Sequence, residues 1–140
     1  MLYPLLFHPR FKERVWGGRR LAELYGKPLP AGQVVGESWE LSDRPGDASV
    51  IANGRLAGQS LRWLMEHHSH DLLGAACEPG ARFPLLIKIL DARETLSLQV
   101  HPPNAKAREL GGEPKTEMWY VAHADPGAEL FVGLKQGVTR

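Results

Sequence analysis

Two polar side chains two residues apart, Gln99 and His101, are of types that can bind a metal ion. They lie in Thr95–His101 (TLSLQVH), where polar and apolar residues alternate, and this alternation predicts a β-strand. Because side chains alternate between the two faces of a strand, Gln99 and His101 share a face and their donor atoms can meet one metal ion. The alternative is a half-buried strand whose polar face points into water.

A second pair, Lys115 and Glu117, lies on one face of the strand-like segment KTEMWY. Glu117 offers oxygen ligands for a metal. Lys115 is a candidate acid or base, because desolvation and a nearby cation both lower the pKa of an ammonium group. The alternative is an ion pair at the start of a strand, and such surface pairs contribute little to stability.

Lys88 is unusual because it lies in the longest apolar run of the chain, residues 83–90. A lysine in such a run extends its ammonium group to water or pairs with an acidic residue. It can also line a pocket that receives an anion. The sequence leaves these alternatives open.

The elements that position these residues are expected to be mainly strands. Gly and Pro, 15 and 11 in number, favour many turns over long helices. We predict one irregular segment, residues 1–33, with a short helix at Arg19–Tyr25, followed by a β-rich part, residues 34–140. The best helix is Ser60–Leu73, capped by Ser60 and stopped by Gly74. The predicted strands are Val34–Ser42, Ala48–Ala52, Leu85–Asp91, Thr95–His101, Thr116–Ala124 and Ala128–Leu134, with a hairpin turn at Asn53-Gly54 and a short helix at Asn104–Leu110.

Composition restricts the classes of protein. The 140 residues suit a single domain, and 43% hydrophobic and 24% charged residues predict a folded chain. A net charge of +1 argues against a nucleic-acid partner. The absence of a signal-peptide pattern and of a long apolar run predicts a cytoplasmic protein without membrane contact. The single cysteine, Cys77, fits a reducing compartment and is expected to be structural.

Several segments together resemble type I phosphomannose isomerases (mannose-6-phosphate isomerases). They are SLQVHPP at Ser97–Pro103 and KTEMWY at Lys115–Tyr120, preceded in the same order by VWGG at Val15–Gly18, GESWELS at Gly36–Ser42 and PLLIKILDA at 84–92. Q-V-H-P alone is weakly specific, whereas the ordered set is a strong match. The resemblance spans nearly the whole chain, corresponds to the N-terminal part of the family and is greatest to its shorter bacterial members.

The resemblance implies a cupin-type (jelly-roll) β-barrel, incomplete here, with one helix before the central strands. It implies that Gln99, His101 and Glu117 bind one divalent ion, zinc, as three of four ligands. It also implies that Lys115 assists proton transfer and that Ser97 lines the substrate pocket. The implied reaction interconverts mannose 6-phosphate and fructose 6-phosphate through an enediol, with a metal acting as Lewis acid and a separate base moving the proton.

The chain also departs from the family pattern. The family's fourth ligand is a His in a later V-H-A-like segment, and its late arginine and phosphate-binding residues also lie beyond Arg140. Among the six histidines, His123 is a minor candidate for the missing ligand. It lies six residues after Glu117, an even spacing that places both on the same face of the predicted strand. His67, His68 and His70 are expected to have no function beyond favouring the end of their helix.

Two alternatives to the isomerase follow from these departures. The chain can be a non-catalytic sugar-phosphate-binding or regulatory cupin domain. An iron dioxygenase of the cupin type needs more histidines around its metal than this set provides. A barrel without its later strands leaves an open sheet edge, and we expect self-association along that edge.

Overall fold

The computed structural model describes residues 1–75, 78 and 80–138, so Cys77 lies outside the described residues. The chain divides into two compact units, Met1–Ser97 and Leu98–Arg140, where the sequence predicts one domain. Each unit is described by itself below. Within the described residues, no helix is long and apolar enough to cross a membrane.

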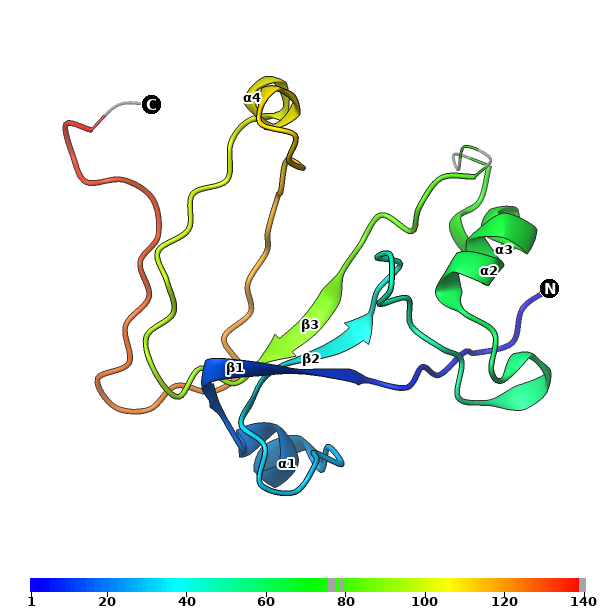
Figure 1. Cartoon of the computed structure of the whole chain (residues 1–140), viewed down its shortest axis with the longest axis horizontal. Helices are drawn as coiled ribbons and strands as arrows, with labels where there is room; N and C mark the ends of the chain where they lie inside the picture. Colours follow the sequence, from blue (N-terminus) through cyan, green and yellow to red (C-terminus); the bar gives the residue numbers. More distant parts are fainter. Residues whose placement is uncertain (76–77, 79, 139–140) are drawn as a thin grey trace. The chain divides into compact units, whose positions relative to one another are not determined.

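The first unit is built on a three-stranded antiparallel sheet (Figure 1). Its strands are β1 (Arg10–Gly18), β2 (Val35–Leu41) and β3 (Ile87–Leu90), in the order β1-β2-β3. The predictions of strands at Val34–Ser42 and Leu85–Asp91 are confirmed by β2 and β3. β1 lies in the segment predicted to be irregular. Its basic residues hid the strand pattern, because they pair with acidic residues that lie far away in the sequence. Arg10 and Lys12 pair with Asp47, and Arg14 pairs with Glu37.

Two glycines let β1 and β2 approach closely. A Cβ atom added to Gly17 would lie 2.4 Å from the backbone nitrogen of Gly36, and one added to Gly36 would lie 2.5 Å from Cβ of Arg14. The pairing of β1 with β2 is irregular beyond Lys12, where the register shifts. The VWGG and GESWELS segments therefore meet at a contact between backbones that leaves no room for a side chain.

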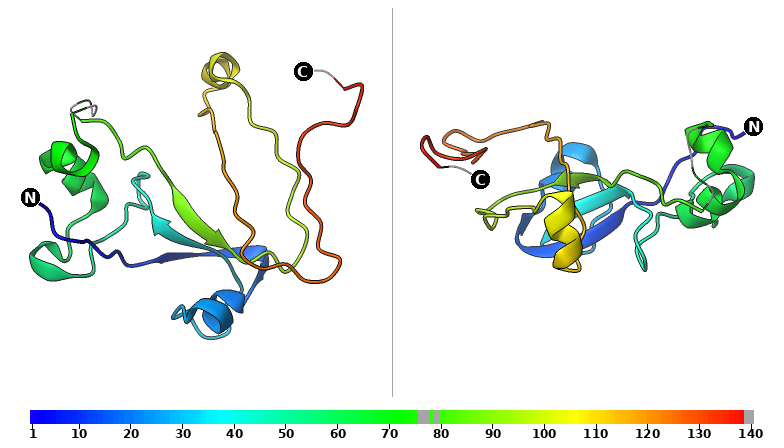
Figure 2. Two further views of the ribbon diagram at one scale, coloured as in Figure 1. Left: turned by 180° about the vertical axis from the view of Figure 1, so that it is seen from behind. Right: turned by 90° about the horizontal axis from the view of Figure 1, so that it is seen from above.

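The helices of the first unit are short. α1 (Arg20–Tyr25) follows β1 directly. After β2 come a 3₁₀ turn, η1 (Gly54–Leu56), and two helices, α2 (Leu61–His67) and α3 (Ser69–Leu73). α1 and the α2–α3 pair lie at different ends of the sheet (Figures 1 and 2). The apolar core of this unit centres on Ile51, Leu61 and Leu64.

The predicted helix Ser60–Leu73 is confirmed, with a break. The Ser60 hydroxyl accepts a hydrogen bond from the backbone N–H of Trp63 at 3.0 Å, as expected of a cap. His68 adopts a non-helical conformation (φ −138°, ψ 23°) and separates α2 from α3. Gly74 ends α3 with a positive φ of 75°, which glycine adopts without steric cost.

α1 confirms the predicted helix at Arg19–Tyr25 but lacks a local cap. Its N-cap residue, Arg19, makes no side-chain cap hydrogen bond. The backbone N–H of Arg20 instead donates to Oδ2 of Asp91, a buried carboxylate that follows β3, at 2.7 Å. A residue 71 positions later in the chain thus supplies the hydrogen-bond acceptor for the first backbone N–H of this helix.

Two local predictions in the first unit are wrong in detail. Ala48–Ala52 forms two isolated bridges, Phe7 to Ile51 and Val50 to Ser60, rather than a strand. Asn53-Gly54 does not form a hairpin turn, because the Asn53 side chain accepts from the N–H of Leu6 at 2.8 Å and Gly54 begins η1. The Asn53 amide thus ties the N-terminal segment to η1.

The second unit contains α4 (Asn104–Glu109), which confirms the predicted helix at Asn104–Leu110. α4 lies at the turn between two extended segments (Figure 1). The predicted strands at Thr95–His101, Thr116–Ala124 and Ala128–Leu134 are wrong, since none of these segments pairs into a ladder with the described residues. Alternation marks residues able to form a strand, but a strand also needs a neighbour for its N–H and C=O groups. The sequence predicts a mainly β fold, whereas the described residues form one three-stranded sheet and several short helices.

Glu37 is a buried carboxylate on the sheet, with 6% of its surface exposed. Burial alone would raise the pKa of Glu37. The hydrogen bond from the Trp39 indole and the charges of Lys88 and Arg14 outweigh burial, so the pKa of Glu37 lies below its usual value of 4.5. Asp47 has a lowered pKa as well, chiefly because Lys12 donates a hydrogen bond to it.

Replacing Ser60 by alanine should lower the free energy of unfolding by about 1 kcal/mol, because the N–H of Trp63 loses its acceptor. Urea unfolding followed by circular dichroism measures this change. Ser69→Ala, at the first residue of α3, is the matched control and should have a smaller effect. Equal losses in the two variants would contradict the assignment of Ser60 as the cap.

The lowered pKa of Glu37 makes stability depend on pH. A carboxyl with a lower pKa in the folded state contributes stability above its usual value of 4.5, and that contribution disappears as the pH falls through the folded-state pKa. Glu37→Gln should therefore lower the free energy of unfolding by about 2 kcal/mol at pH 7. It should also flatten the decline in stability below pH 5.

Denaturant unfolding between pH 3.5 and 7 tests this dependence. The exposed carboxyl of Glu23 provides the control, Glu23→Gln. A pH profile of Glu37→Gln that parallels the parent would show that Glu37 is not the group responsible.

Candidate functional site

The second unit places three of the predicted site residues together. The segment that ends at His101 runs into Pro102-Pro103 and then α4. Gly111, with a positive φ of 66°, follows the helix and allows the chain to turn back. The returning segment carries Lys115 and Glu117 to His101.

One carboxylate, that of Glu117, joins this group. Its Oε2 lies 3.5 Å from Nε2 of His101, and its Oε1 lies 2.8 Å from Nζ of Lys115. The three side chains are about one-third exposed, at 30% for His101 and Glu117 and 34% for Lys115. Each carboxylate oxygen thus faces a different partner, and solvent and small solutes can reach the group.

The spacing of His101 and Glu117 fits two ligands of one zinc ion. Zn–N and Zn–O distances near 2.1 Å and tetrahedral angles place two donor atoms about 3.4 Å apart. Imidazole nitrogen and carboxylate oxygen are both common zinc donors. No third His, Cys, Asp or Glu of the described residues joins this pair in a group able to hold a metal ion. A third protein donor would therefore be of another type, such as the amide oxygen of Gln99.

The remaining predicted residues are divided between the two units. Gln99 precedes His101 by two residues in the second unit, whereas Ser97 is the last residue of the first unit. Lys88 is on β3, where its Nζ lies 3.7 Å from Oε1 of Glu37. Lys88 therefore has an acidic partner in this sheet.

Other histidines have local partners. Nε2 of His123, the minor candidate for a further ligand, lies 3.4 Å from Oδ1 of Asp125. The Trp63 ring stacks on His67 with ring centroids 4.5 Å apart, and Nδ1 of His68 lies 3.6 Å from Asp71. These contacts account for the three side chains through interactions within their own segments.

Sequence reasoning missed the residues around Lys88. Three donors from three strands approach Glu37: Nε of Arg14 at 3.3 Å, the indole N–H of Trp39 at 2.6 Å and Lys88. The signal was present in GESWELS, an acidic residue inside a strand-like segment. Strand pairing was needed to show that this acid lies beside the lysine of the apolar run.

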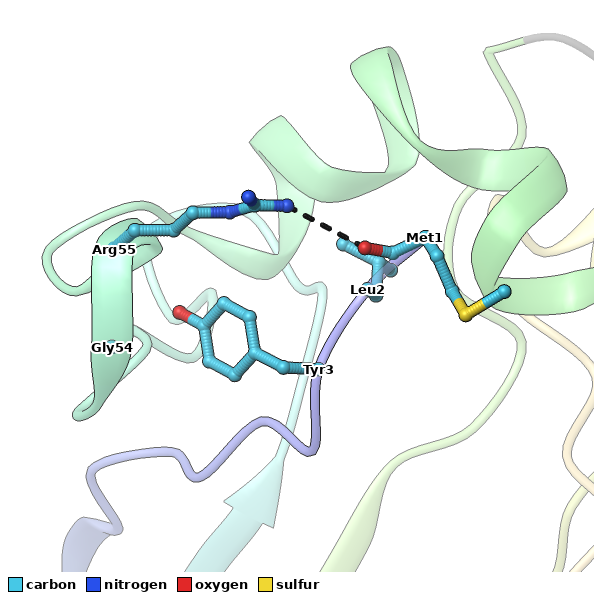
Figure 3. A pocket seen from close by; sticks show the side chains of 5 residues that line it. All are labelled: Met1, Leu2, Tyr3, Gly54 and Arg55. Carbon is cyan, nitrogen blue, oxygen red and sulfur yellow. Dashed lines mark hydrogen bonds between the residues drawn. The ribbon is translucent and has the colours of Figure 1, made fainter.

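A pocket of about 410 Å³ lies elsewhere in the first unit, between the N-terminal residues and η1 (Figure 3). The Tyr3 hydroxyl on its wall donates to the Asn53 carbonyl at 2.7 Å and accepts from the Leu56 N–H at 2.9 Å. Arg55 donates to the Met1 carbonyl at 3.5 Å. These polar groups join the N-terminal segment to η1, and the pocket is not part of the candidate site.

Comparisons with known proteins identify the family of the chain. Residues 5–115 match the family described as phosphomannose isomerase type I, catalytic domain. Lys115 is the last residue of the match. The chain is 46% identical over 132 residues to mannose-6-phosphate isomerase ManA of Bacillus subtilis, and 43% identical over 134 residues to the mannose-6-phosphate isomerase of Streptococcus mutans. These alignments cover 93% and 95% of this chain but 40% and 41% of the relatives.

Solved structures show the same relationship. The crystal structure of the mannose 6-phosphate isomerase from Bacillus subtilis is similar over 77% of this chain and 33% of that protein, with a TM-score of 0.68 and 38% identity. A mutant of the phosphomannose isomerase from Salmonella typhimurium is similar over 74% of this chain and 27% of that protein, with a TM-score of 0.63 and 30% identity. The chain thus spans about 40% of the length of the curated relatives that it matches, and it belongs to the type I phosphomannose isomerase catalytic-domain family.

Proposed function

We propose that residues 1–140 form the N-terminal portion of a cupin-type domain that interconverts mannose 6-phosphate and fructose 6-phosphate with one zinc ion. The observation that carries the proposal is the group in which Glu117 faces both His101 and Lys115. Gln99, His101 and Glu117 are assigned to the metal. Membership of the family supports mannose 6-phosphate as the proposed substrate, since the relatives are named mannose-6-phosphate isomerases.

The proposed reaction moves a proton between two neighbouring carbons of the sugar. A bound zinc ion would supply Lewis-acid stabilisation of the negative charge that develops on the sugar oxygens. Lys115 is assigned to proton transfer. A lysine can act as the base in such a step once it has lost its own proton. The contact with Oε1 of Glu117 at 2.8 Å fixes the position of its Nζ atom.

Ser97 and Lys88 are assigned to substrate binding. A hydroxyl donates to or accepts from sugar hydroxyl groups. An ammonium group offers charge and three donors to a phosphoryl group. These assignments rest on residue type and on the match to the family.

The second candidate is a non-catalytic domain that binds sugar phosphates or has a regulatory role. The side chains of His101 and Glu117 are 30% exposed, so this group can contact a ligand without converting it. This alternative expects binding of the sugar phosphate without turnover. A cytoplasmic location remains part of both proposals.

Metal content tests the assigned ligands. The purified chain should hold about one zinc ion, and Gln99→Ala, His101→Ala and Glu117→Ala combined should remove it. His67→Ala is the control, because it deletes an imidazole of the first unit that stacks on Trp63. Equal zinc in the parent and the triple variant would refute the assignment.

Assays with mannose 6-phosphate then separate the two candidates. Turnover by the zinc-loaded chain supports the isomerase, with Lys115→Gln expected to reduce the rate by about 10²- to 10⁴-fold while zinc is retained. Binding of the sugar phosphate without turnover supports the non-catalytic domain.

Self-association is proposed for the second unit. Its extended segments expose large apolar side chains, and extended backbone without a neighbour can pair with another chain. Four of the most exposed are Leu98, Val100, Met118 and Phe131. Burying them against a second copy would remove this surface from water.

Light scattering measures this association. The parent should form a dimer or larger species at about 100 μM, a concentration at which weak interfaces are populated. Val100→Lys combined with Phe131→Lys should restore the monomer. Val15→Lys is the control, because Val15 is an apolar residue of the first unit that is even more exposed than Val100 and Phe131. A parent that stays monomeric throughout would rule the proposal out.

A further inference from the structure

The pocket between the N-terminal residues and η1 contains none of the residues assigned to the metal or the substrate. Its volume is about 410 Å³, and it is lined by Met1, Leu2, Tyr3, Gly54 and Arg55 (Figure 3). Cavities that hold small molecules in proteins begin at about 300 Å³. The pocket is therefore large enough for a small ligand, and the kind of ligand follows from its lining residues.

The Tyr3 ring forms a fixed apolar wall of the pocket. Its hydroxyl donates its hydrogen to the Asn53 carbonyl at 2.7 Å and accepts from the N–H of Leu56 at 2.9 Å. The ring packs against Gly54, where an added Cβ atom would lie 2.5 Å from Cε2 of Tyr3. Because the hydroxyl is already engaged, Tyr3 offers a ligand the surface of its ring, which stacks on other flat apolar groups.

Arg55 brings hydrogen-bond donors to the pocket. Figure 3 shows its side chain extending past the Tyr3 ring toward Met1. Within the part of the chain that the structure describes, its guanidinium donates one hydrogen bond, to the Met1 carbonyl at 3.5 Å, and no carboxylate pairs with it. A guanidinium has five N–H donors, so most of them can serve a ligand.

The charge of Arg55 is not offset by its surroundings. The amino group of Met1 lies 3.8 Å from Oδ2 of Asp71 on α3, so its positive charge has a negative partner. Arg55 has no such partner among the described residues. An excess of about one positive charge therefore remains at the pocket, since a guanidinium stays protonated at neutral pH. This excess fits a ligand with a single negative charge.

We propose that this pocket binds a small monocarboxylate with a flat apolar body, whose carboxylate pairs with Arg55 and whose apolar body lies on the Tyr3 ring. An arginine can donate two parallel hydrogen bonds to a carboxylate, which fixes the orientation of the ligand. The apolar body would also cover exposed surface of Met1 and Leu2 and remove it from water. The site goes beyond the proposed function, because it shares no residue with the metal or substrate assignments.

The test is a titration of the full chain with benzoate, followed by the backbone N–H signal of Leu56 in ¹H–¹⁵N spectra. This N–H reports on the pocket because it donates to the Tyr3 hydroxyl. The signal should shift and saturate with a dissociation constant of about 1 mM, as expected of a ligand with few atoms. Benzyl alcohol has the ring without the charge, and acetate has the charge without the ring. Each should bind about tenfold more weakly than benzoate, or less.

Substitutions of Arg55 test its role in the site. Arg55→Gln removes the charge and should weaken the binding of benzoate about tenfold. Arg55→Lys keeps the charge but loses the planar fork, so its affinity should lie between those of the parent and Arg55→Gln. Arg93→Gln is the matched control, because Arg93 is another exposed arginine of the first unit and does not line the pocket. Arg55 is itself exposed, so the variants should fold, and circular dichroism checks this.

Several results would overturn the inference. They are an unshifted Leu56 signal with benzoate, binding of acetate or benzyl alcohol as tight as that of benzoate, and equal losses in Arg55→Gln and Arg93→Gln. Fructose 6-phosphate should leave the Leu56 signal unshifted, because it has no apolar body, and a shift as large as that with benzoate would also count against the site. Zinc content and turnover do not depend on this pocket, so failure here leaves the proposed function untouched.

Discussion

The carboxylate of Glu37 draws a donor from each strand of the only sheet found in the described residues. A buried charge must be compensated by partners at fixed positions, so this one group links β1 and β3 to β2. The glycine contact between Gly17 and Gly36 supports the arrangement, since it brings β1 close enough for Arg14 to reach the carboxylate. Electrostatics and backbone packing thus act together to place Lys88.

Glu117 has a related role in the second unit, where one carboxylate again serves two partners. The two carboxylates differ in their exposure to solvent. The side chains of Glu117 and His101 are about one-third exposed, whereas the Glu37 side chain is 8% exposed. An accessible carboxylate can exchange a partner for a metal ion or a substrate at little cost. A buried carboxylate holds its partners, which suits it to positioning other groups.

Much of the local structure was predictable from sequence. The helix beginning at Ser60 follows from its cap and its apolar spacing, and β3 follows from its apolar run. β1 was missed because charged residues that pair across the sheet look like residues in water. The predicted strand at Thr95–His101 failed because pairing depends on a neighbouring segment, which alternation cannot supply. Of the site, the grouping of His101, Lys115 and Glu117 was predictable, whereas the acid beside Lys88 required the strand register.

The hydrogen bond from Arg20 to Asp91 has a consequence for the order in which the chain folds. A six-residue helix is unstable alone, and the residue that satisfies its first turn lies 71 positions away. During synthesis, α1 leaves the ribosome long before Asp91 does, and it must wait for that residue. The N-terminal third of the first unit is therefore expected to become ordered late, when the chain that follows β3 emerges and closes a long loop.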